Sequence, residues 1–170
     1  MKNGCRGHFP LECIADLRGV ADWADQTLER LGERPLHPAD PNQPLVFRML
    51  CLPTLSQACS IRAEAYGQSW RLFCRELSGD AGYELGELTR REERLIVGVD
   101  AERLTELWKY LHFWSMAPSD DKEVLDGTGY VLEAAERGRY RVIYRDDPEW
   151  GDTFGEFSEL LLDLAGLSPR

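Results

Sequence analysis

The residues in this sequence best able to do chemistry are its carboxylates, because Asp and Glu together make up 30 of the 170 residues. A carboxylate can act as a general acid or base, and Asp126 and Glu133 lie in a stretch that we expect to form a hairpin. Many other carboxylates could do the same, so this pattern selects no catalytic residue. Glycine-rich phosphate loops, nucleophile elbows and metalloprotease helices do not occur in the sequence. We assign no catalytic residue and no cofactor, and we favour a binding protein over an enzyme.

The cysteines and histidines lack the spacing of metal ligands. Cysteine occurs at Cys5, Cys13, Cys51, Cys59 and Cys74, and histidine at His8, His37 and His112. No C-x-x-C pair is present, which favours reduced thiols packed as small apolar groups. The loop at residues 119–123 is acidic but lacks the glycine and the final glutamate of a calcium loop. The sequence therefore predicts no metal site.

The carboxyl-terminal end is the most acidic part of a chain whose net charge is −10. We expect its partner-binding residues to be Asp146, Asp147, Glu149, Trp150, Asp152 and Glu156. Such a surface would attract a basic protein and disfavours nucleic acid and anionic membranes. The alternative interpretation is a solvated face that keeps the protein in solution.

The composition favours one folded domain spanning residues 1–170, in which 43% of the residues are hydrophobic. No apolar run is long enough to cross a membrane, and acidic and basic residues interrupt the amino-terminal stretch where a signal peptide would lie. We expect a cytoplasmic protein, although a processed chain would look the same. The expected organisation is a helical segment (1–32), a proline-rich connector (33–44), and a sheet with two helices (45–170).

The first half of the chain shows helical and then strand patterns. Apolar residues at helical spacing predict one or two helices within residues 10–31, with a bend at Gly19. The run at 45–52 predicts a central strand. Residues 57–66 and 69–77 predict a hairpin with a turn at Gly67-Gln68, which pairs Ile61 with Cys74. On its other face, Tyr66 and Phe73 are flanked by arginines. We expect another element to cover these rings, and a nucleotide-stacking platform is the alternative.

Further along, residues 83–89 and 93–99 predict two strands, separated by a charged break at 90–92. For residues 93–99 the alternative is the start of a helix, because Arg91, Glu92 and Arg94 are good helix formers. A helix is expected from Ala101, capped by Asp100 and ended by Pro118. The aromatic residues of this helix are expected in the core, and the alternative is that they line a ligand pocket. These aromatic residues are Trp108, Tyr110, Phe113 and Trp114. His112, which lies among them, is expected to be structural.

Residues 125–145 predict a second hairpin. A three-residue turn at 136–138, with Gly138 in third place, would set Glu133 opposite Arg141. In this register Tyr140 and Val142 lie on the opposite, core face. A two-residue turn would pair Glu133 with Val142 and mix polar and apolar side chains on one face, so we prefer the three-residue turn. A final helix is expected after a capping box formed by Thr153 and Glu156, with its end at Gly166.

The last quarter of the chain resembles a loose group of uncharacterised small bacterial α+β proteins. The resemblance rests on the patterns D126-G127-x-x-Y130-x-L132-E133 and G138-x-Y140-x-V142-x-x-R145-x-x-P148, followed by a helix ending L164-A165-G166-L167. Proteins of this size and acidity are frequent among immunity proteins to secreted bacterial toxins. What the resemblance implies is a binding function directed at a basic toxin.

Together these patterns predict an α+β fold, in which an antiparallel sheet of hairpins has helices packed on one side. Two functions remain open. The first is a non-enzymatic acidic binding protein, of which an immunity-type inhibitor of a toxin is the most specific form. The alternative is a small-molecule-binding domain or hydrolytic enzyme that uses loop carboxylates and an aromatic-lined pocket.

Overall fold

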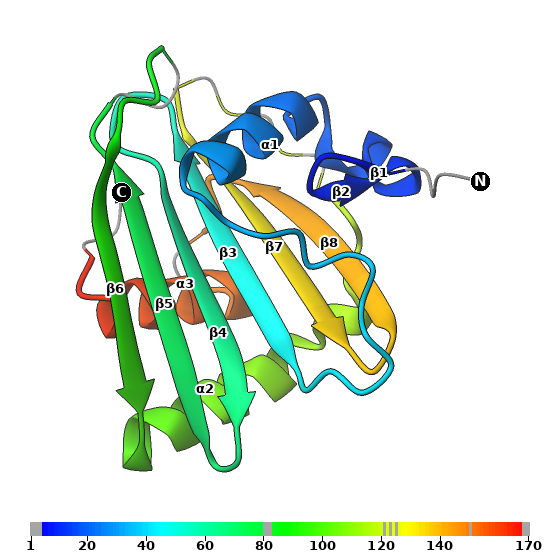
Figure 1. The fold of residues 1–170 in the computed structure, drawn as a ribbon, viewed down its shortest axis with the longest axis vertical. Coiled ribbons are helices and arrows are strands. Elements are labelled where there is room, and N and C mark those ends of the chain that lie inside the picture. Colours follow the sequence, from blue (N-terminus) through cyan, green and yellow to red (C-terminus); the bar gives the residue numbers. More distant parts are fainter. Residues whose placement is uncertain are drawn as a thin grey trace.

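A six-stranded antiparallel sheet organises the molecule in its computed structural model, which describes residues 5–79, 83–120, 122, 124, 126–149 and 151–167 (Figure 1). The strands follow the order β6-β5-β4-β3-β7-β8. Their bounds are β3 (Val46–Pro53), β4 (Cys59–Tyr66), β5 (Ser69–Leu77), β6 (Leu88–Ile96), β7 (Thr128–Glu136) and β8 (Arg139–Asp146). A small separate pair is formed by β1 (Cys5–Arg6) and β2 (Phe9–Pro10). The predicted α+β class with an antiparallel sheet is confirmed.

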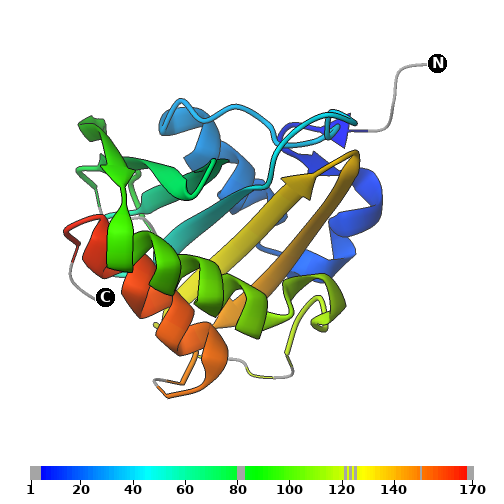
Figure 2. The ribbon, with the colours of Figure 1, turned by 90° about the horizontal axis from the view of Figure 1, so that it is seen from below.

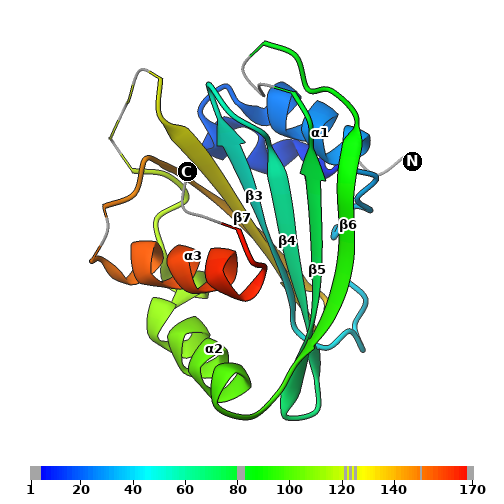
Figure 3. The ribbon, with the colours of Figure 1, turned by 90° about the vertical axis from the view of Figure 1, so that its left-hand side faces the viewer.

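Both faces of this sheet carry helices, whereas the sequence pattern predicted them on one side only. Helices α2 (Gly98–Leu111) and α3 (Thr153–Leu164) lie side by side on one face (Figures 2 and 3). Helix α1 (Ala21–Arg30) and the segment before it cover part of the other face. Side chains of β3 alternate between the two resulting cores, with Phe47 and Met49 on the α2/α3 side and Leu50 and Leu52 on the α1 side. This double burial explains the nearly continuous apolar run at 45–52 and confirms the predicted central strand.

The hairpin of β4 and β5 has the predicted register. Ile61 lies opposite Cys74 and Glu64 lies opposite Arg71, around a turn at Gly67-Gln68. The expected inner face packs against α2 and α3, where Ile61 and Cys74 are almost fully buried. The alternating pattern of apolar and polar residues predicted this register correctly because the second face of the hairpin is partly polar. The two faces therefore differ in composition.

The predicted register of the β7/β8 hairpin is wrong. Glu136 pairs with Arg139 across a two-residue turn in which Arg137 and Gly138 have φ values of 47° and 80°. Glu133 therefore lies opposite Val142, and Tyr140 shares its face instead of facing away. The physical reason is that Glu133 is itself fully buried, so a glutamate on this face does not mark it as solvent-facing.

The predicted division of residues 83–99 is also wrong. A single edge strand, β6, runs through the expected break, and residues 83–87 precede it without forming a strand. Five consecutive charged residues at 90–94 are tolerated because one edge of β6 is unpaired and most of its side chains reach water. Helix α2 begins at Gly98, three residues earlier than expected, and ends at Leu111, well before Pro118. The exposed His112 follows in a left-handed conformation, with φ of 49°.

The amino-terminal and carboxyl-terminal helices follow the expected pattern with local changes. Two 3₁₀ turns, Leu11–Cys13 and Ala15–Leu17, precede α1, and Gly19 with φ of 85° separates them from it. Residues 33–44 form an irregular connector, as expected. Helix α3 is capped by Asp152, whose carboxylate accepts a hydrogen bond from the Gly155 amide at 2.6 Å. The predicted capping box, which placed the cap at Thr153, is therefore one residue out of place.

Candidate functional site

The six predicted partner-binding residues do not form one surface of equivalent side chains. Asp146 accepts a hydrogen bond from the Val124 amide at 2.9 Å. The exposed Asp147 has a left-handed backbone, with φ of 44°, and its carbonyl accepts from the Lys122 ammonium. Both therefore hold Lys122 and Val124 against the end of β8. Trp150 lies outside the described residues.

The other three predicted residues belong to the start of α3. Glu149 is exposed just before the helix, and Asp152 is committed to capping it. Glu156 is exposed one turn into the helix and faces a groove that α3 forms with α2. Of the six, Glu156 is therefore the residue that the structure brings together with further candidate binding residues.

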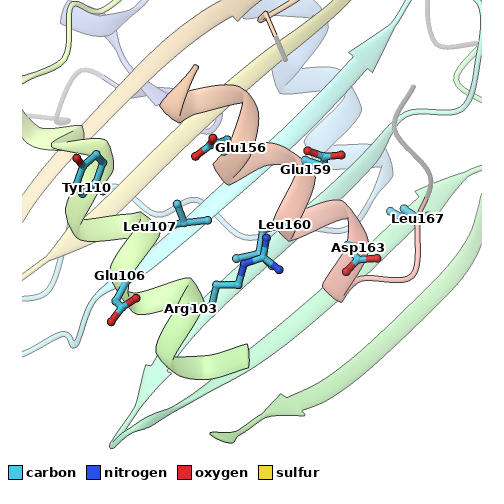
Figure 4. Close-up of a pocket in the computed structure, with 9 residues that line it drawn as sticks. All are labelled: Arg103, Glu106, Leu107, Tyr110, Glu156, Glu159, Leu160, Asp163 and Leu167. Carbon is cyan, nitrogen blue, oxygen red and sulfur yellow. The ribbon is translucent and has the colours of Figure 1, made fainter. Parts of the chain in front are cut away.

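The groove between α2 and α3 has a volume of about 730 Å³ (Figure 4). Its two walls are built from residues at helical spacing i, i+3, i+4, i+7, so each helix contributes one continuous stripe. The stripes are Arg103, Glu106, Leu107 and Tyr110 on α2, and Glu156, Glu159, Leu160 and Asp163 on α3, with Leu167 at one end. The same two stripes are visible in the sequence once the helices are known to be neighbours.

The groove is strongly acidic. It is lined by the four carboxylates Glu106, Glu156, Glu159 and Asp163 and by one guanidinium, that of Arg103. All four carboxylate residues are exposed, and in the described part of the chain none of the four forms an ion pair. Unpaired like charges on adjacent helices repel one another, so they do not stabilise the fold and remain available to cations on another molecule.

Apolar side chains form the base of the groove. Leu160 and Leu167 are 3% and 8% exposed, and Leu107 is partly buried beside them. Tyr110, in contrast, is 73% exposed at the rim. An apolar base with a charged rim can bind an amphipathic segment, and exposed tyrosine is enriched among residues that contribute most to binding.

A second cluster of charged side chains lies on the opposite face of the sheet, but it is buried. The Arg48 guanidinium donates to Glu133 from Nε at 2.9 Å and to the Arg34 carbonyl from Nη1 at 2.7 Å. Tyr140 donates its hydroxyl proton to Glu133 at 2.7 Å, and Glu33 lies 3.4 Å from Arg48. Burial alone would lower the pKa of Arg48, but the carboxylates of Glu133 and Glu33 raise it above its ordinary value. These contacts fasten the connector to β3 and β7.

Glu33 joins this network to β4 and β5. Its carboxylate accepts from Ser60 at 3.1 Å and from Arg62 Nε at 3.2 Å, and it lies 3.5 Å from Arg75. Sequence reasoning missed the network, although Arg48 is the one charged residue in the apolar run 45–52. Because Arg48, Glu33 and Glu133 are paired and closed off from water, we assign them to stability rather than to catalysis.

Of the aromatic residues in and just after α2, Tyr110 lines the groove, whereas Trp108 and Phe113 belong to the core. Trp108 stacks on Phe47 at 4.6 Å between ring centroids, and Phe113 is 1% exposed. The expectation that such aromatics belong to the core is confirmed for these two. Cys59 and Cys74 lie in the same core, where burial raises the pKa of Cys74 to about 12. That thiol is therefore unsuited to nucleophilic chemistry near neutral pH.

Within the described ranges, no group of three or more His, Cys, Asp or Glu side chains is arranged to hold a metal ion. None of the described helices combines the length and apolarity needed to cross a membrane. A comparison of the chain with models of known protein families found no match, and a comparison with curated protein sequences found none.

Proposed function

We propose that this chain is a non-enzymatic binding protein whose α2/α3 groove binds a basic amphipathic helix of a partner protein. The observation that carries the proposal is the pairing of an apolar base with four unpaired carboxylates in one groove. Lysine and arginine side chains on the partner would neutralise the carboxylates. Its apolar stripe would lie against Leu107, Leu160 and Leu167, as in other helix-in-groove complexes.

The two parts of the groove act on different steps of binding. Exposed carboxylates attract a basic partner over about a Debye length and so raise the association rate. Contact with the apolar base and with Tyr110 removes apolar surface from water, which slows dissociation. Specificity would then come from the match between the charge spacing of the partner and the helical stripes.

The most specific form of this function is an immunity-type inhibitor that binds a basic bacterial toxin in the cytoplasm. The small size of the chain and its net charge of −10, which are frequent among immunity proteins, support this form. Inhibition by such a protein needs no chemistry of its own. It requires only that the bound complex covers the toxin's active surface.

The test compares two triple variants of equal net charge after a partner has been captured and identified. The groove variant carries Glu106→Gln, Glu156→Gln and Glu159→Gln, and the control carries Glu12→Gln, Glu29→Gln and Glu84→Gln, all exposed in the wild type. We expect the groove variant to slow association about tenfold or more at low salt, whereas the control should retain most of the wild-type rate. Stopped-flow or surface plasmon resonance measures both rates.

A further variant, Tyr110→Ala, distinguishes the effect of short-range contact with the partner from that of long-range electrostatic attraction. We expect faster dissociation with little change in the association rate, because a rim aromatic acts through short-range contact. Equal slowing of association by both triple variants would show that only the total charge matters. That result would remove the groove from the proposal.

A further inference from the structure

The sheet face opposite the groove contains a depression with a basic lining. It has a volume of about 420 Å³ and is lined by Gly32, Arg34, Arg62, Glu64, Phe73 and Arg75. It lies beside the connector, over β4 and β5, where α1 does not extend across the sheet (Figure 1). Three guanidiniums meet at this place on a protein of net charge −10.

Two of the three guanidiniums are fixed before any ligand arrives. Arg62 lies 4.2 Å above the ring of Phe73 and donates to Glu33 from Nε and to Glu64 from Nη1. Arg75 donates from Nη1 to the carbonyls of Leu31 and Gly32. Within the described part of the chain, Nη2 of Arg62 and Nη2 of Arg75 donate to no other group. Both atoms therefore remain able to donate to an added acceptor.

The third guanidinium, Arg34, belongs to the connector and is more exposed than the other two. Its side chain is 68% exposed, and among the described residues it forms one ion pair, with Glu64 at 3.2 Å. Glu64 is the carboxylate at the rim of the depression, where it accepts from Arg34 and Arg62. Glu64 neutralises the three guanidiniums only in part. It is partly exposed, and it forms no hydrogen bond with Arg75 in the described structure.

The charge balance at this place favours an anion. Burial lowers the pKa of Arg62, Glu33 and Glu64 raise it, and the nearby guanidiniums of Arg34 and Arg75 lower it further. The sheet register places two further arginines beside the depression, Arg71 opposite Glu64 and Arg91 opposite Arg75, against one carboxylate, Glu93, opposite Phe73. A dianion with several acceptor oxygens would relieve the repulsion and use the available donors together.

We propose that this depression binds a phosphate dianion, either as free phosphate or as the phosphate group of a small monoester. Arg62 and Arg75 form the prearranged donors, Phe73 holds the Arg62 guanidinium in place, and Arg34 closes over the bound anion from the connector. The rings of Tyr66 and Phe73 are not bare stacking surfaces, because the guanidiniums of Arg71 and Arg62 lie over them. The site therefore recognises the phosphate rather than a run of stacked bases.

The experiment is isothermal titration calorimetry of the full chain with inorganic phosphate and with adenosine monophosphate. The site requires saturable binding of at least one of them. Equal affinities would identify free phosphate as the ligand, and tighter binding of adenosine monophosphate would identify the monoester. Arg34→Gln should weaken binding about tenfold, since it removes one charge-assisted interaction and leaves the fold intact. Arg30→Gln is the matched control. The side chain of Arg30 is 50% exposed, and it forms a comparable ion pair with Glu87 at 3.3 Å.

A second variant acts in the opposite direction. Glu64→Gln should tighten phosphate binding several-fold, because it removes the one carboxylate at the rim and releases Arg34 and Arg62. A merely unfolded or loosened variant could not produce that gain. The proposal is overturned if neither probe binds, if Arg30→Gln weakens binding as much as Arg34→Gln, or if Glu64→Gln fails to tighten it. Binding of oligothymidylate that exceeds binding of both small probes and grows with strand length would also overturn it, in favour of a nucleic-acid surface.

Discussion

The buried network around Arg48 and the groove between α2 and α3 use the same residue types with opposite results. In the network, Glu33 and Glu133 are each bonded to guanidiniums and have no access to water. In the groove, Glu106, Glu156 and Glu159 are exposed, and no ion pair in the described chain engages them. Pairing and burial thus separate carboxylates that hold the fold from those that remain available to a partner. Four predictions test this separation.

The largest effect is expected from Arg48→Met. The change leaves two buried carboxylates without their shared cation, and we expect the free energy of unfolding to fall by about 3–5 kcal/mol. Urea denaturation followed by circular dichroism measures this value. Combining Arg48→Met with Glu133→Gln should cost less than the sum of the single changes, because the neutral amide no longer needs a cation. A loss below about 1 kcal/mol for Arg48→Met would contradict the assignment of the network to stability.

Alkaline pH should destabilise the fold in part through Tyr144, which is buried on the network side of the sheet. Burial, and then the charge of Asp146, raise the pKa of Tyr144 to about 12. In the unfolded chain the phenol ionises near pH 10, so its stabilising contribution is complete below that pH and is lost between about 10 and 12. We expect the stability to fall there with a slope of up to about 1.4 kcal/mol per pH unit from this group.

Tyr144→Phe should reduce that slope when the free energy of unfolding is measured across the same pH range. Tyr110→Phe is the matched control, since its ring lies at the exposed rim of the groove. An unchanged slope in Tyr144→Phe would show that other groups govern alkaline unfolding. The buried Cys74 thiol, with a pKa raised to about 12, is the next to replace.

A smaller effect is expected at the start of α3. Asp152→Ala removes the side chain that accepts from the Gly155 amide, and we expect a loss of about 1 kcal/mol in the free energy of unfolding. Thr153→Ala should cost less, because Thr153 is the first helical residue and not the cap. Thermal denaturation of both variants distinguishes them. A larger loss for Thr153→Ala would restore the capping box that the sequence suggested.

The smallest effect on stability is expected in the groove. Glu106→Gln, Glu156→Gln and Glu159→Gln should each change the free energy of unfolding by less than about 0.5 kcal/mol, since they break no ion pair of the described chain. The same three changes are those expected to slow partner binding. Marked destabilisation by any of them in urea would place that carboxylate with the structural network instead.

The sequence predicted the fold class, the central strand β3 and one hairpin register, but it missed the register of the β7/β8 hairpin and the single edge strand β6. The register of the β4/β5 hairpin was predictable because Ile61 and Cys74 face the α2/α3 core, whereas Arg62 and Glu64 lie on a more polar face. For β7 and β8, the rule that polar side chains face water placed Glu133 outside. Its partner Arg48 is 85 residues away in the sequence, and no local pattern reveals that pairing.

One residue of the groove, Glu156, is among the partner-binding residues expected from the sequence. The groove itself was not predicted, because its second wall comes from α2, about 50 residues earlier in the chain. Alternating patterns do not show which two helices become neighbours. The hydrogen bonds that Asp146 and Asp152 accept from backbone amides could not be predicted either. They depend on where β8 ends and where α3 begins.

The place of β3 in the sheet has a consequence for synthesis of the chain on the ribosome. Strands β3 to β6 follow one another and can pair as they emerge, whereas β7, the other neighbour of β3, is made more than 70 residues after it. Until then β3 is a temporary edge, apolar on both faces and open to pairing with other chains. Arg48 lies in the middle of that edge, and a charge there discourages such pairing until Glu133 arrives to neutralise it. We therefore expect Arg48, which later anchors the core, to disfavour aggregation while the chain is incomplete.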